Sequence, residues 1–364
     1  MNIITPIQLF QLLTSMILRR WEKAGSHRIL PVKGIGLRSL LLASLTAALA
    51  YGSDEISSAQ ADLQERVNAT ESTVIEGSDD WLFLKSGANS YSLPAVWPRE
   101  GASGSDPLEV VTGFAEMLAN EGIDLIVVPV PDKAAVYPDK LVAELAPDAL
   151  ADGPHEDFVS RLQEAGVTVV DLAPEFRAMR ASGTAPFARQ DSHWSPAGME
   201  FAVKAVADEL AGADWLDEEA TGRAVTEEAE VSALGDLVTM GELESYEPEV
   251  FSITRVEAQE GSVEEDESPV VLIGDSHLLV YHQPINGGIE ASGAGFPDHF
   301  FAETGVGVDV VANQGGGINL PRARLARRRG DDANLAGKQA VVWVFSSRDL
   351  TEASRGWVPI PVIR

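Results

Sequence analysis

The amino-acid sequence predicts an α/β protein, a three-layer α/β/α sandwich built around a mainly parallel sheet. Several apolar runs are short, continuous and bounded by turn residues, which is typical of strands covered on both faces. Segments with helical periodicity alternate with these runs. Each strand also ends in polar or glycine residues, at the carboxyl end where open α/β sheets place their functional sites.

The elements are expected in a regular order. A turn at 77–80 precedes a short strand at 81–84, and the stretch 217–267 is rich in glutamate and interrupts the alternation as an insertion or an edge hairpin. The sequence predicts helices at 107–121, 155–165 and 196–211, and further strands at 124–130, 167–172, 269–274, 307–313 and 339–345.

Composition indicates a globular protein with a substantial core. Of the 364 residues, 45% are hydrophobic and 23% are charged, and there is no cysteine. The lack of cysteine excludes disulfides, thiolate metal sites and a cysteine nucleophile.

Charge is distributed unevenly. The formal net charge is −29, yet residues 1–51 carry six basic residues against Glu22 alone, a balance of +5 that leaves −34 for the remainder. A body this acidic disfavours nucleic acid as a partner.

The basic front leads into an apolar run at 39–51. This run is short for a membrane span and typical of a signal peptide, and Ala48-Leu49-Ala50 fits a cleavage site. We therefore predict that residues 1–52 are a signal peptide or an uncleaved membrane anchor, the alternative being a buried helix. Residues 53–73 are expected to form a linker, and residues 74–364 the folded domain.

The segment 190–199 places an aspartate and a histidine two positions apart. An imidazole can remove a serine proton, and a carboxylate on its other nitrogen fixes the tautomer. We interpret His193 as the general base and then acid, and Asp191 as the group that orients it. Alternatively, Asp191 caps a helix and His193 is a surface residue. Ser195 before Pro196 is itself a helix-start signal, so both interpretations can hold together.

A serine follows the strand predicted at 269–274. Ser276 comes after Gly274 and Asp275, at a strand-to-helix turn that exposes a nucleophile and offers backbone N–H groups to an oxyanion. Leu278 stands where the G-x-S-x-G elbow of α/β-hydrolases has glycine, so this is a different turn. We interpret Ser276 as the nucleophile.

Three nearby residues are weaker candidates. His277 adjoins Ser276 and competes for the role of base, but neighbouring side chains usually diverge, so we expect it to line the pocket. Gly315 and Gly316 in the run "NQGGG" permit a close backbone approach and are candidate oxyanion donors. A flexible turn is the alternative for this loop.

Basic residues near predicted strand ends offer further contacts. Arg348 could bind substrate or pair with a carboxylate. The same two roles are open to Lys133, for which we favour a structural role. Arginines at 322, 324, 327, 328 and 329 follow the glycine run. They would form a basic face for an anionic glycan or a membrane partner, or a solvated helix face balanced by nearby aspartates.

Several motifs together resemble the SGNH hydrolase-like domain of alginate O-acetyltransferases of the AlgJ/AlgX type. The resemblance covers most of residues 74–350. It is carried by "GSDDWLFLKSG", "VPVPDKAAVYPDKL", "DSHWSPAGM", "GDLVTM", "VLIGDSH" and "VVWVFSSRDL". Other SGNH esterases place the serine first, whereas here the Asp-x-His element precedes it, which matches the circularly permuted order of the acetyltransferases.

The resemblance implies a flavodoxin-like sandwich and a catalytic triad of Asp191, His193 and Ser276, with no metal or cofactor. It implies transfer of an acetyl group through a serine ester to an exopolysaccharide hydroxyl in the periplasm. A membrane-bound O-acyltransferase would supply the acetyl group, within a polysaccharide secretion complex. An exported carbohydrate esterase and a non-catalytic scaffold of such a complex are the alternatives.

Overall fold

The computed structural model describes residues 58, 60–93, 104–147, 154–216, 224–259, 261–264, 266–328, 335–352 and 356–363. The expected signal peptide or anchor at 1–52 lies outside the described residues. The folded unit comprises Ala59–Arg364. Within its described part, no helix has the length and apolar character needed to cross a membrane.

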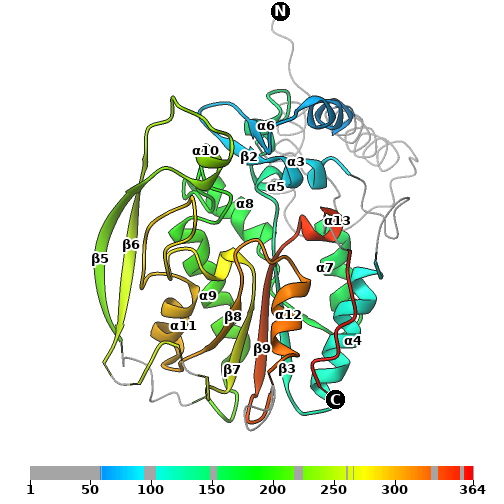
Figure 1. Cartoon of the computed structure of the whole chain (residues 1–364), viewed down its shortest axis with the longest axis vertical. Coiled ribbons are helices and arrows are strands. Elements are labelled where there is room, and N and C mark those ends of the chain that lie inside the picture. Colours follow the sequence, from blue (N-terminus) through cyan, green and yellow to red (C-terminus); the bar gives the residue numbers. More distant parts are fainter. Residues whose placement is uncertain are drawn as a thin grey trace, which may run out of the picture. The chain divides into compact units, whose positions relative to one another are not determined.

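A five-stranded parallel sheet forms the centre of this unit (Figure 1). Its strands lie in the order β4-β3-β9-β7-β8. Their bounds are Asp124–Val130 for β3, Thr168–Val169 for β4, Val270–Gly274 for β7, Asp309–Ala312 for β8 and Ala340–Ser346 for β9. The predicted strands are therefore present, although β4 is much shorter than the apolar run 167–172 that predicted it.

The strand order confirms the circular permutation. Numbered along the chain, the five strands lie in the order 2-1-5-3-4. The flavodoxin-like order is 2-1-3-4-5. If such a chain began at the fourth strand, its strands would be renumbered 4-3-5-1-2 across the sheet. Counted from the opposite edge, this is the order 2-1-5-3-4 seen here. β7 and β9 then flank the point where the strand order reverses, which is where such sheets bind ligands.

Helices cover both faces of the sheet. One face carries α4 (Pro107–Ala119), α7 (Pro154–Glu164) and α12 (Asn319–Leu325), and the other carries α8 (Ala173–Ala181), α9 (Pro196–Leu210) and α11 (Phe296–Thr304) (Figure 1). Along β9, Val341, Trp343 and Phe345 face the first layer, whereas Val342 and Val344 face the second. This alternation, with both sides buried, confirms the predicted three-layer α/β/α sandwich.

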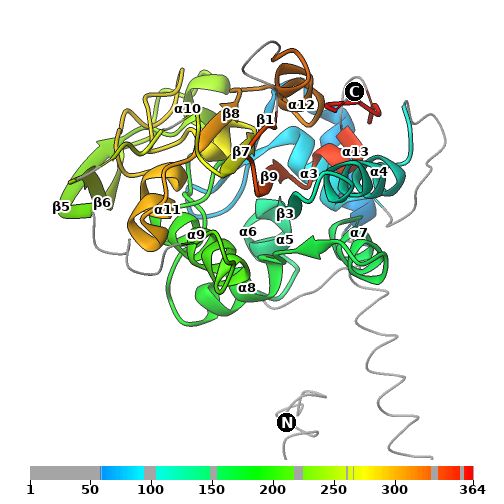
Figure 2. The same ribbon diagram turned by 90° about the horizontal axis from the view of Figure 1, so that it is seen from below.

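The glutamate-rich stretch contains a separate two-stranded antiparallel ribbon. Its strands, β5 (Ala224–Ala233) and β6 (Glu249–Ala258), pair with each other along their full length, and β6 packs against α11 and α9 at the side of the molecule (Figure 2). Between them lies α10 (Asp236–Met240), which the sequence analysis did not predict. The stretch is therefore an insertion with a strand pair of its own, which does not extend the edge of the five-stranded sheet, and it also brings a helix to the site.

The expected linker requires a correction. Residues 60–69 are helical and bury Leu63 and Val67 in the core, because one face of this otherwise polar segment is apolar. This part of 53–73 thus packs with the folded domain. The remaining short elements are β1 (Val74–Glu76), β2 (Leu82–Leu84), α3 (Lys85–Tyr91), α5 (Lys133–Val136), α6 (Pro138–Leu141), η2 (Ser276–Leu278) and α13 (Asp349–Glu352).

Candidate active site

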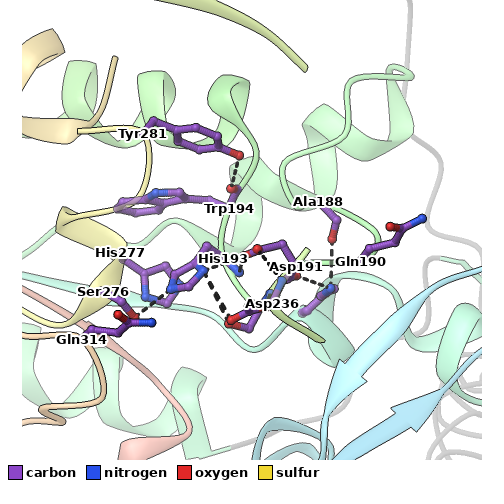
Figure 3. A network of polar contacts seen from close by, with 12 residues as sticks. Ala188, Gln190, Asp191, His193, Trp194, Asp236, Ser276, His277, Tyr281 and Gln314 are labelled. Atoms are coloured by element: carbon purple, nitrogen blue, oxygen red, sulfur yellow. Dashed lines mark hydrogen bonds and ion pairs between the residues drawn. The ribbon is translucent and has the colours of Figure 1, made fainter. Parts of the chain in front are cut away.

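Asp191, His193 and Ser276 form a hydrogen-bonded line at the carboxyl edge of the sheet (Figure 3). His193 Nε2 lies 2.7 Å from Ser276 Oγ, and His193 Nδ1 lies 2.6 Å from Asp191 Oδ1. Asp191 and His193 are buried, and Ser276 retains 7% exposure. This is the geometry that lets an imidazole remove the serine proton while a carboxylate holds the opposite nitrogen.

The loop that carries Asp191 and His193 is fixed by the helix that follows it. Ser195 caps α9 by accepting a hydrogen bond from the Gly198 N–H, with Pro196 in the first turn, as the sequence indicated. Trp194 is fully buried and stacks on Phe296. Asp191 does not cap this helix, because its oxygens accept from His193 and from a neighbouring backbone N–H.

Lys133 holds the same loop from the other side. Its buried Nζ donates to the carbonyl oxygens of Ala188, Arg189 and Asp191 at 2.9, 3.2 and 2.7 Å. The ammonium group also lies 5.7 Å from the centre of the Trp81 ring and 5.6 Å from that of Phe83. The "DDWLFL" and "PDK" motifs thus support the catalytic loop, consistent with the structural role favoured for Lys133.

Asp236 is a site residue that the sequence analysis missed. Its backbone N–H donates to Asp191 Oδ2 at 2.9 Å, and its carboxylate accepts from both the N–H and the hydroxyl of Ser192 at 2.6 Å. Gly235 allows this approach, since a Cβ there would lie 2.1 Å from the Gln190 carbonyl oxygen. The motif "GDLVTM" was the available signal, but nothing in its spacing placed it beside the triad.

Ser276 begins η2 directly after β7. Asp275 caps this turn by accepting from the His277 N–H at 2.8 Å, and its other oxygen accepts from the Ser346 N–H on β9 at 3.1 Å. Gly274 is required because a Cβ there would lie 2.3 Å from the Val344 carbonyl oxygen. Within "GDS", the glycine therefore allows the strands to pack, the aspartate caps the turn, and the serine is placed at its start.

The competition between His193 and His277 is decided by their contacts. His277 Nδ1 lies 2.9 Å from Asp275 Oδ1, and its ring packs edge-on against Trp194 and His193. Burial lowers the pKa of His277, and the charge of Asp275 only partly offsets this effect. His277 is thus a neutral packing group, and His193 has the contact with Ser276.

Electrostatics prepare His193 to accept a proton. Burial alone would lower the pKa of His193, but the charge and hydrogen bond of Asp191, aided by Asp236 and Asp275, raise it above 6.5. Burial would likewise raise the pKa of Asp191, yet His193 holds it below its ordinary value. The pair therefore favours a carboxylate and a basic imidazole.

The candidate oxyanion donors differ in their availability. The Gly316 N–H donates to the Asn313 carbonyl oxygen at 3.1 Å, so it is engaged in a turn, whereas Gly315 has a φ of 63° with open space around its Cα. The Asn313 N–H donates to the Gly274 carbonyl oxygen at 3.2 Å, which brings this loop to the Ser276 turn.

A small cavity with both polar and apolar side chains in its lining adjoins Ser192 and His277. It measures about 20 Å³ and is lined by Asp132, Lys133, Ser192, His277, Ser346 and Arg348, among others. Arg348 Nη1 donates to Ser346 Oγ at 2.8 Å. Burial raises the pKa of Asp132 to about 7, although Arg348 partly offsets this effect. The cavity is large enough for one water and too small for a sugar.

Asp191, His193 and Asp236 bring three atoms of metal-ligand type within 4.8 Å of one another. These groups are, however, already joined by short hydrogen bonds to one another and to Ser192. Their chemistry fits a proton-transfer network better than a cation site.

The predicted basic face is only partly present. Arg322 is buried over the Trp343 ring at 4.6 Å, and Arg328 pairs with Asp309. Arg324 and Arg327 are exposed, and Arg329 lies outside the described residues. Two of the arginines therefore stabilise the fold, which reduces the surface charge available to a partner.

A flavodoxin-like sheet with this permutation and a Ser-His-Asp array at its carboxyl edge defines an SGNH-type acyl-transfer protein. The chain belongs to the family described as SGNH hydrolase-like domain, acetyltransferase AlgX, whose model matches residues 74–347. The resemblance inferred from the motifs is thereby confirmed.

Similar proteins agree with this assignment. The "Probable alginate O-acetylase AlgJ" of Pseudomonas fluorescens is 26% identical over 362 residues, covering 93% of this chain and 81% of the relative. The O-acetyltransferase domain of Pseudomonas putida AlgJ matches with a TM-score of 0.58 at 26% identity, over 77% of this chain and 92% of that domain. Pseudomonas aeruginosa AlgX matches with a TM-score of 0.52 at 19% identity, over 75% of this chain and 61% of that chain. At this identity the match supports the fold alone.

Proposed function

We propose that this protein is an O-acetyltransferase that moves an acetyl group, through an ester on Ser276, to a hydroxyl of a polysaccharide. The observation that carries the proposal is the line of hydrogen bonds from Asp191 through His193 to Ser276, at 2.6 and 2.7 Å. Membership of the acetyltransferase AlgX family supports acetyl as the group transferred.

The first half-reaction loads the serine. His193 Nε2 accepts the Ser276 proton as Oγ attacks the acetyl carbonyl carbon of the donor ester. The tetrahedral intermediate then collapses, the bond to the leaving oxygen breaks, and His193 returns the proton to that oxygen. Asp191 stabilises the imidazolium that exists between these two proton transfers.

The second half-reaction repeats these steps with a sugar hydroxyl. His193 takes the hydroxyl proton, the sugar oxygen attacks the acetyl carbon, and Ser276 Oγ departs and regains the proton. The Ser276 and Gly315 N–H groups are the proposed oxyanion donors. Gly316 is a weaker candidate because its own N–H is already engaged. Arg348 and His277, which line the small cavity next to Ser192, are proposed to support the site.

The acceptor is proposed to be an exopolysaccharide, with alginate as the first candidate because the curated relatives are named alginate O-acetylases. Residues 1–52 are proposed to direct export to the periplasm, cleaved or retained as an anchor. A membrane-bound O-acyltransferase would then supply the acetyl group, within a polysaccharide secretion complex. The boundary of the catalytic domain is proposed to lie before the helix at 60–69.

Transfer to sugar is tested with the full chain, a small activated acetyl ester and a panel of oligosaccharides that includes alginate fragments. Mass spectrometry follows acetyl groups on the sugars, with Ser276→Ala beside the wild type. Acetylated oligosaccharide that depends on Ser276 is the expected result. Release of acetate alone, again dependent on Ser276, would favour the esterase. Equal behaviour of the two proteins would favour the scaffold.

A further inference from the structure

Two carboxylates face the same nitrogen of His193. Asp191 Oδ1 lies 2.6 Å from Nδ1, and Asp236 Oδ2 lies 3.8 Å from it. Asp236 is 2% exposed and comes from α10, far along the chain from the catalytic loop. The second carboxylate is therefore too distant for a direct hydrogen bond but close enough for a strong charge interaction.

Two hydrogen bonds favour the ionised form of Asp236. Both of its oxygens accept hydrogen bonds from Ser192, one from the N–H and one from the hydroxyl, each at 2.6 Å. Hydrogen bonds that are donated to a carboxylate favour its charged form. Burial and the charge of Asp191 act in the opposite sense and raise the pKa of Asp236. A buried carboxylate in such a position needs a compensating cation.

Lys133 supplies a positive charge on the other side of the loop. It donates only to backbone carbonyl oxygens, including that of Asp191, and its described contacts contain no ion pair. Burial lowers the pKa of Lys133 to about 8, while Asp191, Asp236 and Glu249 oppose this effect. The ammonium group therefore remains charged at neutral pH.

With Asp236 ionised, the charges of Asp191, Asp236 and Lys133 sum to −1 around a neutral imidazole, and the imidazolium cancels this charge. Glu249, whose charge also acts on Lys133, is paired with Arg189. The other charged or titratable groups near His193 are Asp275 and His277 at the Ser276 turn. They bond to each other, and the charge of Arg348 acts on both.

We propose that Asp236 and Lys133 are a pair of positioning residues with opposite charge that sets how readily His193 takes the Ser276 proton. Asp236 stabilises the imidazolium, and Lys133 limits that stabilisation while holding the Asp191 loop in place. The proposal rests on the function proposed above. It differs from a purely mechanical role because removal of Asp236 and removal of Lys133 must change the pKa of His193 in opposite directions.

The test compares kcat/KM for a small acetyl ester from about pH 5 to about pH 8, a range that covers the titration of an imidazole. The full chain is used, as wild type and as D236N, K133Q and S192A. Asn at 236 keeps the shape and removes the charge. Gln at 133 keeps an N–H donor for the loop. The S192A variant removes a hydroxyl that donates to Asp236 and lies 3.5 Å from His193 Nδ1, so it weakens the support for the Asp236 charge without removing the carboxylate.

In the wild type, activity should fall as the pH drops through a midpoint above 6.5, because a raised pKa leaves His193 protonated and unable to act as a base there. D236N should move this midpoint to lower pH by about one unit, the usual effect of an adjacent charge. K133Q should move it to higher pH, and S192A should move it in the same direction as D236N but by less, because the Ser192 hydroxyl donates to Asp236. The double variant D236N/K133Q should return it toward the wild type.

Shifts of D236N and K133Q in the same direction, or no shift in either, would overturn the proposal. If K133Q does not fold, as judged by its thermal melt, the midpoint of D236N decides, since a mechanical role predicts a lower kcat/KM at every pH with an unchanged midpoint. Failure of the proposed function is distinguishable, because the wild type would then show no turnover that depends on Ser276.

Discussion

His193 has a hydrogen-bonding partner on each ring nitrogen, and the two partners come from distant segments. Asp191 precedes it by two positions, whereas Ser276 follows 83 positions later, in the turn after β7. The neighbouring histidine, His277, is occupied by its own aspartate. At the scale of single residues, the site is therefore two Asp-His pairs, of which one contacts the nucleophile and the other packs behind it.

Asp191→Asn tests the orienting role. The amide can present an N–H to His193 Nδ1, which would favour the wrong tautomer and leave Nε2 protonated toward Ser276. We expect kcat for a small acetyl ester to fall by roughly 10³ to 10⁴-fold, as for other triads. His277→Ala should cost less than about tenfold, since its ring packs without contacting Ser276 Oγ. Steady-state kinetics measure kcat for both variants. Equal losses of kcat would contradict the assignment of His193, and not His277, as the general base.

At the scale of elements, the site depends on close contacts between segments that lie far apart in the sequence. The turn before α10 approaches the catalytic loop backbone to backbone at Gly235, and β7 approaches β9 in the same way at Gly274. Lys133 at the start of α5 adds three hydrogen bonds to the loop. The short helix α10 is thus part of the site, although it belongs to the insertion.

Gly235→Ala tests this packing. A methyl group 2.1 Å from the Gln190 carbonyl oxygen must push the loop and α10 apart. We expect a loss of about 1–3 kcal/mol in the free energy of unfolding and a clear fall in kcat. Gly113→Ala is the matched control, because that position is exposed on α4 with open space around it, and it should gain about 0.5–1 kcal/mol. Chemical denaturation measures the free energy of unfolding of both variants. An unchanged free energy of unfolding in Gly235→Ala would contradict the packing argument.

At the scale of the whole molecule, much of the fold was predictable because its signals are local. Continuous apolar runs predicted the buried strands, and Ser195-Pro196 predicted the start of α9. The order of the Asp-x-His and Gly-Asp-Ser motifs predicted the permutation that the strand order confirms.

Other features could not be predicted, for physical reasons. Asp236 reaches the triad only through a turn inside the glutamate-rich insertion, and no periodicity encodes that approach. Residues 60–69 are polar overall, so burial of Leu63 and Val67 depends on a partner surface that lies elsewhere in the chain. Arg322 is buried because its guanidinium packs over the Trp343 ring and donates to the Ile318 carbonyl oxygen and to Asn319 Oδ1. An arginine-rich run in the sequence does not reveal these contacts.

The central claim is that the acetyl group passes through Ser276, and the mass of the Ser276 peptide tests it most directly. The full chain is mixed with an activated acetyl ester, quenched within one turnover, digested and analysed by mass spectrometry. We predict one acetyl group on Ser276 in the wild type, none there in Ser276→Ala, and faster loss of the label when a suitable oligosaccharide is added. Turnover without any acetyl group on Ser276, or acetylation of another residue with the same kinetics in Ser276→Ala, would contradict the account.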